Sequence, residues 1–133
     1  MIYAQYDISK IEQALYDVVK ASGMTLNIFP ADRPDTVVTS MNDFAVVKVV
    51  TAVTDLNAYG KGICRIEMFA RDLPSGIKNQ AKITYMTGKL ISALPIQHST
   101  YLFDSGNSIV PMGRDGKGFS VVGVNINLII KNL

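Results

Sequence analysis

The sequence is poor in the residues that carry most enzyme chemistry. Its 133 residues include one cysteine, one histidine and no tryptophan. A single cysteine excludes an internal disulfide and a cysteine-based zinc site. No apolar run reaches the roughly 20 residues of a membrane-spanning helix, and the opening MIYAQYDISK lacks the basic start and apolar core of a signal peptide. We therefore expect a small soluble protein from a reducing compartment.

The charge balance is nearly even, with 13 lysine and arginine residues against 11 acidic ones. A net charge of +2 is too small to indicate nucleic-acid binding by itself. Hydrophobic residues make up 48% of the chain, and a chain of this length buries about two-thirds of its unfolded surface. The sequence therefore predicts a single domain over residues 1–133 with a full core.

The most regular pattern is the period-two alternation of Phe119–Ile130, FSVVGVNINLII. Every second residue from Val122 is a branched aliphatic one, which is typical of a long central strand. Similar patterns predict strands over residues 24–29, 43–56, 62–71, 100–104 and 108–112. The last two flank a Ser105-Gly106-Asn107 turn, and the glycine-rich loop Gly113–Gly118 leads into the central strand.

The predicted strand Asp43–Leu56 is apolar on both of its faces, and it forms a hairpin with Gly62–Arg71. A sheet with one side in water does not show this pattern. Either a helix of the same chain or a neighbouring subunit must cover the second face. Phe44, Val46 and Val50 lie on that face and are candidate subunit-interface residues.

Two segments have the apolar spacing of amphipathic helices, Asp7–Ser22 and Ser75–Leu94. Gly23 suits the left-handed residue that ends a helix. Gly88 falls within the apolar arc of the second segment, where we expect it to let the helix lie close to a sheet. The predicted fold is α+β, with two helices packed on a mainly antiparallel sheet that contains a long central hairpin.

Candidate catalytic groups are few. Cys64 and His98 are the only thiol and imidazole, but Cys64 alternates with apolar core residues and His98 follows Pro95 in a predicted loop. The loop GRDGKG departs from the phosphate-binding pattern and leads into a strand, whereas a phosphate loop leads into a helix. We expect no catalytic residue, no metal site and no cofactor, and hence no enzyme.

Lysines are the notable charged feature. Lys78, Lys82 and Lys89 are predicted to share the outer face of the second helix, and Arg114 and Lys117 lie in the glycine-rich loop. These side chains form either a solvated surface or a surface that faces DNA phosphates or a protein partner. In the second case they would act by counterion release, without reading the DNA sequence.

The whole layout resembles the tail terminator, or tail-completion, proteins of long-tailed bacteriophages and prophages. The resemblance rests on the N-terminal helix, the apolar hairpin Asp43–Arg71, the helix Ser75–Leu94 and the glycine-rich loop before FSVVGVNINLII. It implies a structural protein of virion assembly, present in the host cytoplasm and then in the virion. Such proteins form an oligomeric ring, usually a hexamer, that caps the tail tube and joins it to the head connector, with DNA in the lumen.

Two alternatives stay open. A head–tail adaptor or another tail protein of similar size fits the same features, and the family has no short motif that assigns site residues. From a different class, a small α+β domain that binds a ligand or peptide as a monomer or dimer would also use an apolar sheet face.

Overall fold

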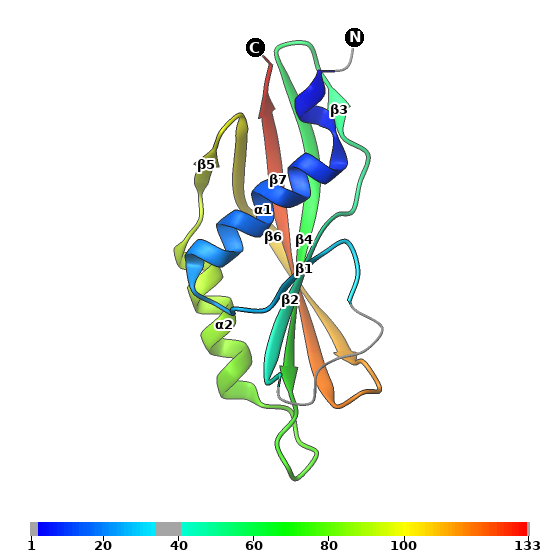
Figure 1. Cartoon of the computed structure of the whole chain (residues 1–133), viewed down its shortest axis with the longest axis vertical. Helices are drawn as coiled ribbons and strands as arrows, with labels where there is room; N and C mark the ends of the chain where they lie inside the picture. Colours follow the sequence, from blue (N-terminus) through cyan, green and yellow to red (C-terminus); the bar gives the residue numbers. More distant parts are fainter. Residues whose placement is uncertain (1–2, 34–40, 133) are drawn as a thin grey trace.

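The computed structural model describes residues 3–33 and 41–132. One seven-stranded sheet runs the length of the molecule, and two α-helices pack on one of its faces (Figure 1). The elements are η1 (Ala4–Tyr6), α1 (Ile8–Ser22), β1 (Ile28–Pro30), β2 (Asp43–Val49), β3 (Thr54–Asp55), β4 (Tyr59–Arg71), α2 (Gln80–Ser92), β5 (Ile96–His98), β6 (Tyr101–Arg114) and β7 (Phe119–Lys131).

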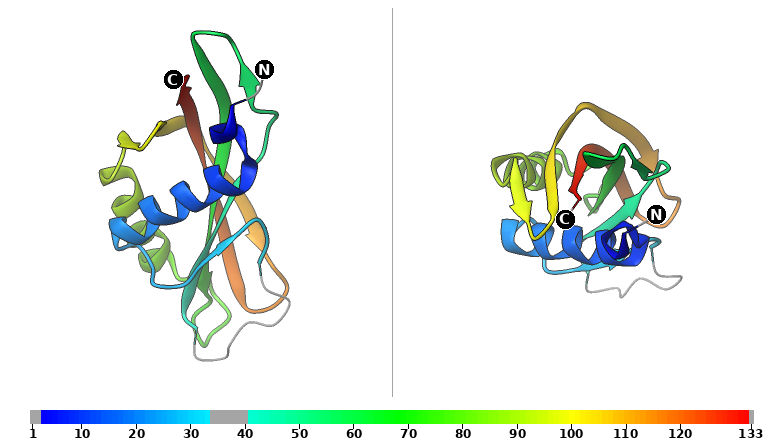
Figure 2. Two further views of the ribbon diagram at one scale, coloured as in Figure 1. Left: turned by 45° about the horizontal axis from the view of Figure 1, so that its top comes forward. Right: turned by 90° about the horizontal axis from the view of Figure 1, so that it is seen from above.

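The strand order is β1-β2-β4-β7-β6-β5, with the short β3 paired to β4. All neighbours are antiparallel except β1 and β2, which are parallel. The sheet curls strongly, and viewed from above it bends around an interior that α1 closes on one side (Figure 2). The α+β fold class, the antiparallel β2–β4 pairing and the central place of β7 confirm the predictions from sequence.

Helix α1 follows its sequence signals. The Asp7 side chain caps the helix by accepting from the Ser9 N–H at 2.8 Å, and Gly23 ends it with a φ of 76°. Helix α2 is shorter than the predicted Ser75–Leu94, because residues 75–79 do not join it and it ends at Ser92. The Leu73 N–H donates to the Ile77 carbonyl at 2.8 Å and closes a separate loop, so the helix starts only after Asn79, whose side chain accepts from the Lys82 N–H.

The main core lies between the two helices and the sheet. The inward side chains of β4 and β7 are almost completely buried there, with those of α1 and α2 above them. The β7 contribution is the set predicted from alternation, namely Val122, Val124, Ile126, Leu128 and Ile130. Burial of this apolar set against both helices provides the main driving force for the fold.

Three strand predictions need correction. The predicted strand over residues 43–56 breaks after Val49. Here the Ile63 N–H donates to the Thr51 hydroxyl oxygen at 2.9 Å, and not to a backbone carbonyl as in a regular strand pair. Residues 101–114 form one strand with a register shift between Ser105 and Ile109, where two short strands and a turn were predicted. The first strand begins only at Ile28.

Candidate assembly surfaces

A second, smaller core lies on the face of the sheet that no helix covers. It consists of the fully buried side chains of Phe44 and Val46 together with Phe69, Phe119 and Val121. Phe44 and Phe69 stack with their ring centroids 4.2 Å apart, and the Phe119 ring meets Phe44 edge-on at 5.1 Å. Phe44 and Val46, two of the predicted interface residues, are fully buried within the chain, so neither side chain lies on its surface.

The cover of this second core comes from the chain itself. Phe29 of β1 and Met41, just before β2, pack against it. The Arg33 guanidinium lies 5.4 Å from the ring centroids of both Phe44 and Phe69. The predicted double-sided burial of β2 is therefore real, but the segments on either side of residues 34–40 supply part of the cover. Of the three predicted interface residues only Val50, which directly follows β2, keeps an exposed side chain.

Asp115 connects the cover to the turn between β6 and β7. Its carboxylate forms an ion pair with Arg33, and its Oδ1 accepts from the backbone N–H groups of Lys117 at 2.7 Å and Phe119 at 3.1 Å. Burial would raise the pKa of this carboxyl, but the Lys117 amide, the Arg33 side chain and the Phe119 amide together lower it. The group is therefore held as an anion that both shapes the turn and anchors Arg33.

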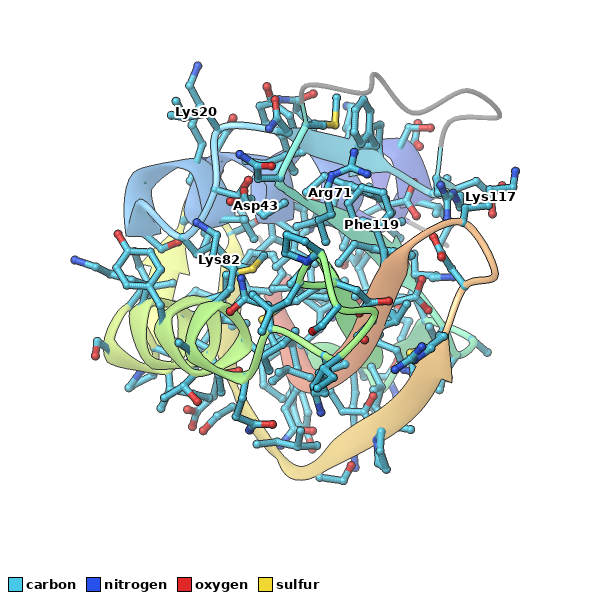
Figure 3. The ribbon with its side chains drawn as sticks, turned by 90° about the horizontal axis from the view of Figure 1, so that it is seen from below. Lys20, Asp43, Arg71, Lys82, Lys117 and Phe119 are labelled. Atoms are coloured by element: carbon cyan, nitrogen blue, oxygen red, sulfur yellow. The ribbon has the colours of Figure 1, made fainter. Side chains whose placement is uncertain are left out.

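Arg71 plays a similar part at the end of β4. Its guanidinium lies 4.6 Å from the Phe119 ring centroid and donates to the Met41 carbonyl at 2.9 and 2.7 Å. Figure 3 shows Arg71 and Phe119 next to each other at this end of the molecule. The neighbouring Asp72 accepts from the Ser120 hydroxyl at 2.6 Å, so the ends of β4 and β7 are joined by side chains as well as by the ladder.

The predicted lysine stripe does not form. Lys82 is paired with Asp43 at 2.7 Å, and Lys82 and Lys89 lie 5.4 and 5.6 Å from the Tyr85 ring on one side of α2. Lys78 precedes the helix and lines a groove on the other side. The reason is the late start of α2, which removes Lys78 from the helical spacing.

The two predicted cations of the glycine-rich loop are where the sequence places them. Arg114 ends β6, Lys117 lies in the turn before β7, and both side chains are exposed. Lys117 projects at the same end of the molecule as Arg71 and Phe119 (Figure 3).

An apolar groove of about 500 Å³ separates α2 from β6. Ile83 and Val122 are nearly buried in it, whereas Ile109 on β6 is 55% exposed. Gly88 also lines the groove, and a Cβ there would meet nothing within 4 Å. The prediction that Gly88 lets α2 lie close to the sheet is therefore wrong. The sequence did not lead us to predict this groove, although Gly88 and Ile109, which line it, both lie in predicted elements.

Strand β6 forms an edge over most of its length. Strand β5 pairs only with Tyr101–Phe103, so within the described chain no strand covers the outer side of residues 104–114. The register shifts at 105–109 and 111–113 and the missing N–H of Pro111 make this edge irregular. The edge therefore suits specific contacts better than open-ended strand addition.

Cys64 and His98 are not brought together. They lie on β4 and β5, which β7 and β6 separate in the sheet. Cys64 is fully buried, as predicted, and burial with a smaller effect of the Glu12 carboxylate raises its pKa to about 12. His98 lies in β5 rather than a loop, with its Nε2 3.3 Å from the Asp17 carboxylate.

Within residues 3–33 and 41–132, no three His, Cys, Asp or Glu side chains are grouped as metal ligands. Over the same residues, neither helix has the length and apolar content needed to cross a membrane.

Comparison with known proteins bears on the fold alone. No protein-family model and no curated protein matches the chain. Twenty chains of solved structures match it. One of them, known only by a sequence identifier, covers 94% of this chain and 93% of its own length with a TM-score of 0.60 and 13% identity. At that identity the likeness shows a shared α+β fold and nothing about activity.

Proposed function

We propose that this chain is a non-enzymatic structural subunit that self-associates into a ring, as phage tail terminators do. In this proposal the ring caps a tail tube and joins it to the head connector, and the subunit passes from the host cytoplasm into the virion. The observation that carries the proposal is β6, whose outer edge over residues 104–114 lacks a described strand partner and presents Ile109 and Met112, 55% and 38% exposed.

An edge of this length is a surface that proteins either protect or use. Here the irregular register and Pro111 disfavour pairing between identical edges, while the exposed apolar side chains and the adjacent groove favour contact with a different surface. A contact between two different surfaces of the same chain is heterologous, and such contacts close into rings when the rotation between subunits permits. This is the geometry that a terminator ring requires.

Light scattering on a sizing column, over a range of protein concentrations, tests the proposal. We expect an oligomer of hexamer size, and we expect Ile109→Lys to reduce it to the 14.5 kDa monomer without loss of fold. Leu26→Lys is the matched control, because Leu26 is 92% exposed on the loop before β1, at the other side of the sheet order. A monomer at every concentration, or an oligomer that Ile109→Lys leaves intact, contradicts the proposal.

The groove itself favours a second candidate, a peptide-binding domain. Its volume of about 500 Å³ and its apolar floor suit an extended apolar segment lying between α2 and β6. In that case the protein is a monomer, and short apolar peptides should shift the amide resonances of Thr84, Thr87 and Gly88 in a titration. Absence of such shifts in a monomeric protein would remove this candidate.

A further inference from the structure

The face of the sheet that no helix covers carries a positioned arginine, Arg65, in the middle of β4. Its chain neighbours Cys64 and Ile66 are buried in the main core beneath the helices. Successive side chains of a strand point to opposite faces, so Arg65 points to the uncovered face. It therefore lies on the other side of the sheet from the groove between α2 and β6.

Neighbouring residues hold the Arg65 side chain in place. Its Nε donates to the Asn125 Oδ1 at 3.0 Å, and the Asn125 Nδ2 in turn donates to the Ser108 hydroxyl oxygen at 2.7 Å. Gly123 leaves room for the stem, because a Cβ there would lie 3.0 Å from the Arg65 Cδ and 3.0 Å from the Met112 Sδ. A glycine inside a central strand weakens it, and here it lets two side chains cross the strand.

The guanidinium that is held in this way has no anionic partner within the described chain. No described carboxylate forms an ion pair with Arg65, and only its Nε forms a hydrogen bond. Glu67, two residues further along β4, is bound instead to Lys48 at 3.1 Å. Lys48 lies directly opposite Arg65 on β2, and like charges in that position repel each other. An anion from outside the chain would relieve this repulsion.

The exposed charges further along the same face are mainly positive. Lys61 on β4 and Lys131 on β7 are both exposed there. Asp104 is the exposed acidic residue on this part of the face, where it pairs with Asn127 in the β6–β7 ladder. This balance makes the face complementary to an acidic surface.

We propose that Arg65 anchors a protein-binding site on this face, for a partner segment that presents a carboxylate beside an apolar side chain. Since Asn125 occupies the Nε, both Nη atoms are left for the paired hydrogen bonds that a guanidinium makes with a carboxylate. Met112, 38% exposed beside the Arg65 stem, provides the apolar contact. This contact favours a peptide over a nucleic acid, whose backbone presents phosphates and no aliphatic side chain.

A titration followed by NMR tests the site with a defined probe, an alternating glutamate–leucine hexapeptide with blocked ends. It is made in the Ile109→Lys variant, so that self-association does not compete. We expect saturable shifts of the Arg65 Nε–H resonance and of the amides of Ser108, Gly123 and Asn125. Arg65→Gln should weaken binding about tenfold, the range for hydrogen bonds to charged groups. Arg65→Lys keeps the charge without the paired donors, and should weaken binding nearly as much.

Arg114→Gln is the matched control, because Arg114 is an exposed arginine at the end of β6. It should leave the affinity for the peptide unchanged, and a lysine–leucine hexapeptide should cause none of these shifts. Absence of shifts with the acidic peptide would overturn the proposal, as would equal weakening by Arg65→Gln and Arg114→Gln. Native affinity in Arg65→Lys would contradict the paired hydrogen bonds.

Other occupants would give different results, and each would replace the proposed partner. A native oligomer that Arg65→Gln dissociates would assign the site to a second copy of the chain. Inorganic phosphate that shifts the Arg65 resonance at as low a concentration as the peptide would assign it to a phosphate-bearing ligand. The site needs neither Ile109 nor the groove, so this test and the sizing test of the ring fail separately.

Discussion

At the scale of single residues, two glycines have opposite surroundings. A Cβ on Gly60 would lie 2.2 Å from the Tyr6 hydroxyl oxygen and 2.5 Å from its ring, whereas a Cβ on Gly88 would meet open space. The Tyr6 hydroxyl donates to the Asn132 side chain at 2.6 Å, and Asn132 in turn donates to Asp55 and to the Asn57 carbonyl. Gly60 therefore makes room for a network that joins the two ends of the chain.

Replacing each glycine by alanine should change stability in opposite directions. Gly60→Ala should lower the free energy of unfolding by about 1–3 kcal/mol, because the Tyr6 ring must move and its bond to Asn132 is lost. Gly88→Ala should raise it by about 0.5–1 kcal/mol, because alanine favours the helix and touches nothing. Urea unfolding measures both values, and destabilisation by Gly88→Ala would contradict the exposed position of this residue.

The lowered pKa of Asp115 predicts that the stability of the protein depends on pH. Its pKa is lowered in the folded protein, so its ionised form stabilises the fold above the pKa of the unfolded chain. This contribution is lost as the pH falls through the lower pKa of the folded state. Compared with Asp115→Asn, the native protein should be more stable by about 1.5–3 kcal/mol at pH 7, the range for hydrogen bonds to charged groups.

The difference between the two proteins should shrink as the pH falls below about 4, where aspartate protonates in unfolded chains. Urea unfolding from neutral to acidic pH measures it. A difference that stays constant over that range would show that the Asp115 charge does not stabilise the fold.

At the scale of elements, β6 shows how tertiary contacts override local signals. Ser105-Gly106-Asn107 has the composition of a turn, yet β7 holds this segment in one continuous, irregular strand. Gly106 is essential to that arrangement, because a Cβ there would lie 2.7 Å from the Asn125 carbonyl oxygen. Since a backbone atom of the central strand cannot move aside as a flexible side chain can, the irregular pairing depends on glycine.

Gly106→Ala should therefore lower the free energy of unfolding by about 1–3 kcal/mol. It should also perturb the bond between the Asn125 amide and the Ser108 hydroxyl, which is 2.7 Å long in the native protein. Amide resonances of residues 105–109 and 123–126 would report the change, while those of α1 should stay in place. Native stability and an unchanged spectrum would contradict the close approach of the two strands.

At the scale of the whole molecule, charge and apolar surface are unevenly placed. Asp43, Asp72 and Asp115 are all bound within the chain. Arg114 and Lys117, at the end of β6 and in the turn before β7, are exposed, and Lys117 projects at the end of the molecule that Figure 3 views. The net charge of +2 conceals this arrangement. If this end faces DNA in a tail lumen, the contact should be weak and governed by phosphate charge.

Duplex DNA binding should then fall steeply between about 50 and 200 mM salt, measured by fluorescence anisotropy. The double variant Arg114→Gln with Lys117→Gln should weaken binding at low salt. The control replaces Lys61 and Lys131 by glutamine, because these exposed side chains lie toward the opposite end of β4 and β7. Equal loss in both variants would indicate a general charge effect, and absence of binding at low salt would remove the DNA contact.

The sequence by itself determined the parts of this protein that depend on local periodicity. Alternation in β7 identified the core face of the central strand, helical spacing and Gly23 located α1 and its end, and the apolar setting of Cys64 placed its thiol in the core. These features depend on neighbours a few residues away, and each is a pattern that burial on one face imposes.

Only the tertiary structure decided what covers each face. The apolar pattern of β2 showed that Phe44 and Val46 must be buried, but not whether a helix, another subunit or the chain itself buries them. The answer depends on Arg33 reaching Asp115 and on Phe29 and Met41 packing against the second core. Contacts between residues so far apart in sequence leave no periodic trace, because either partner alone has the composition of an ordinary polar loop or strand end.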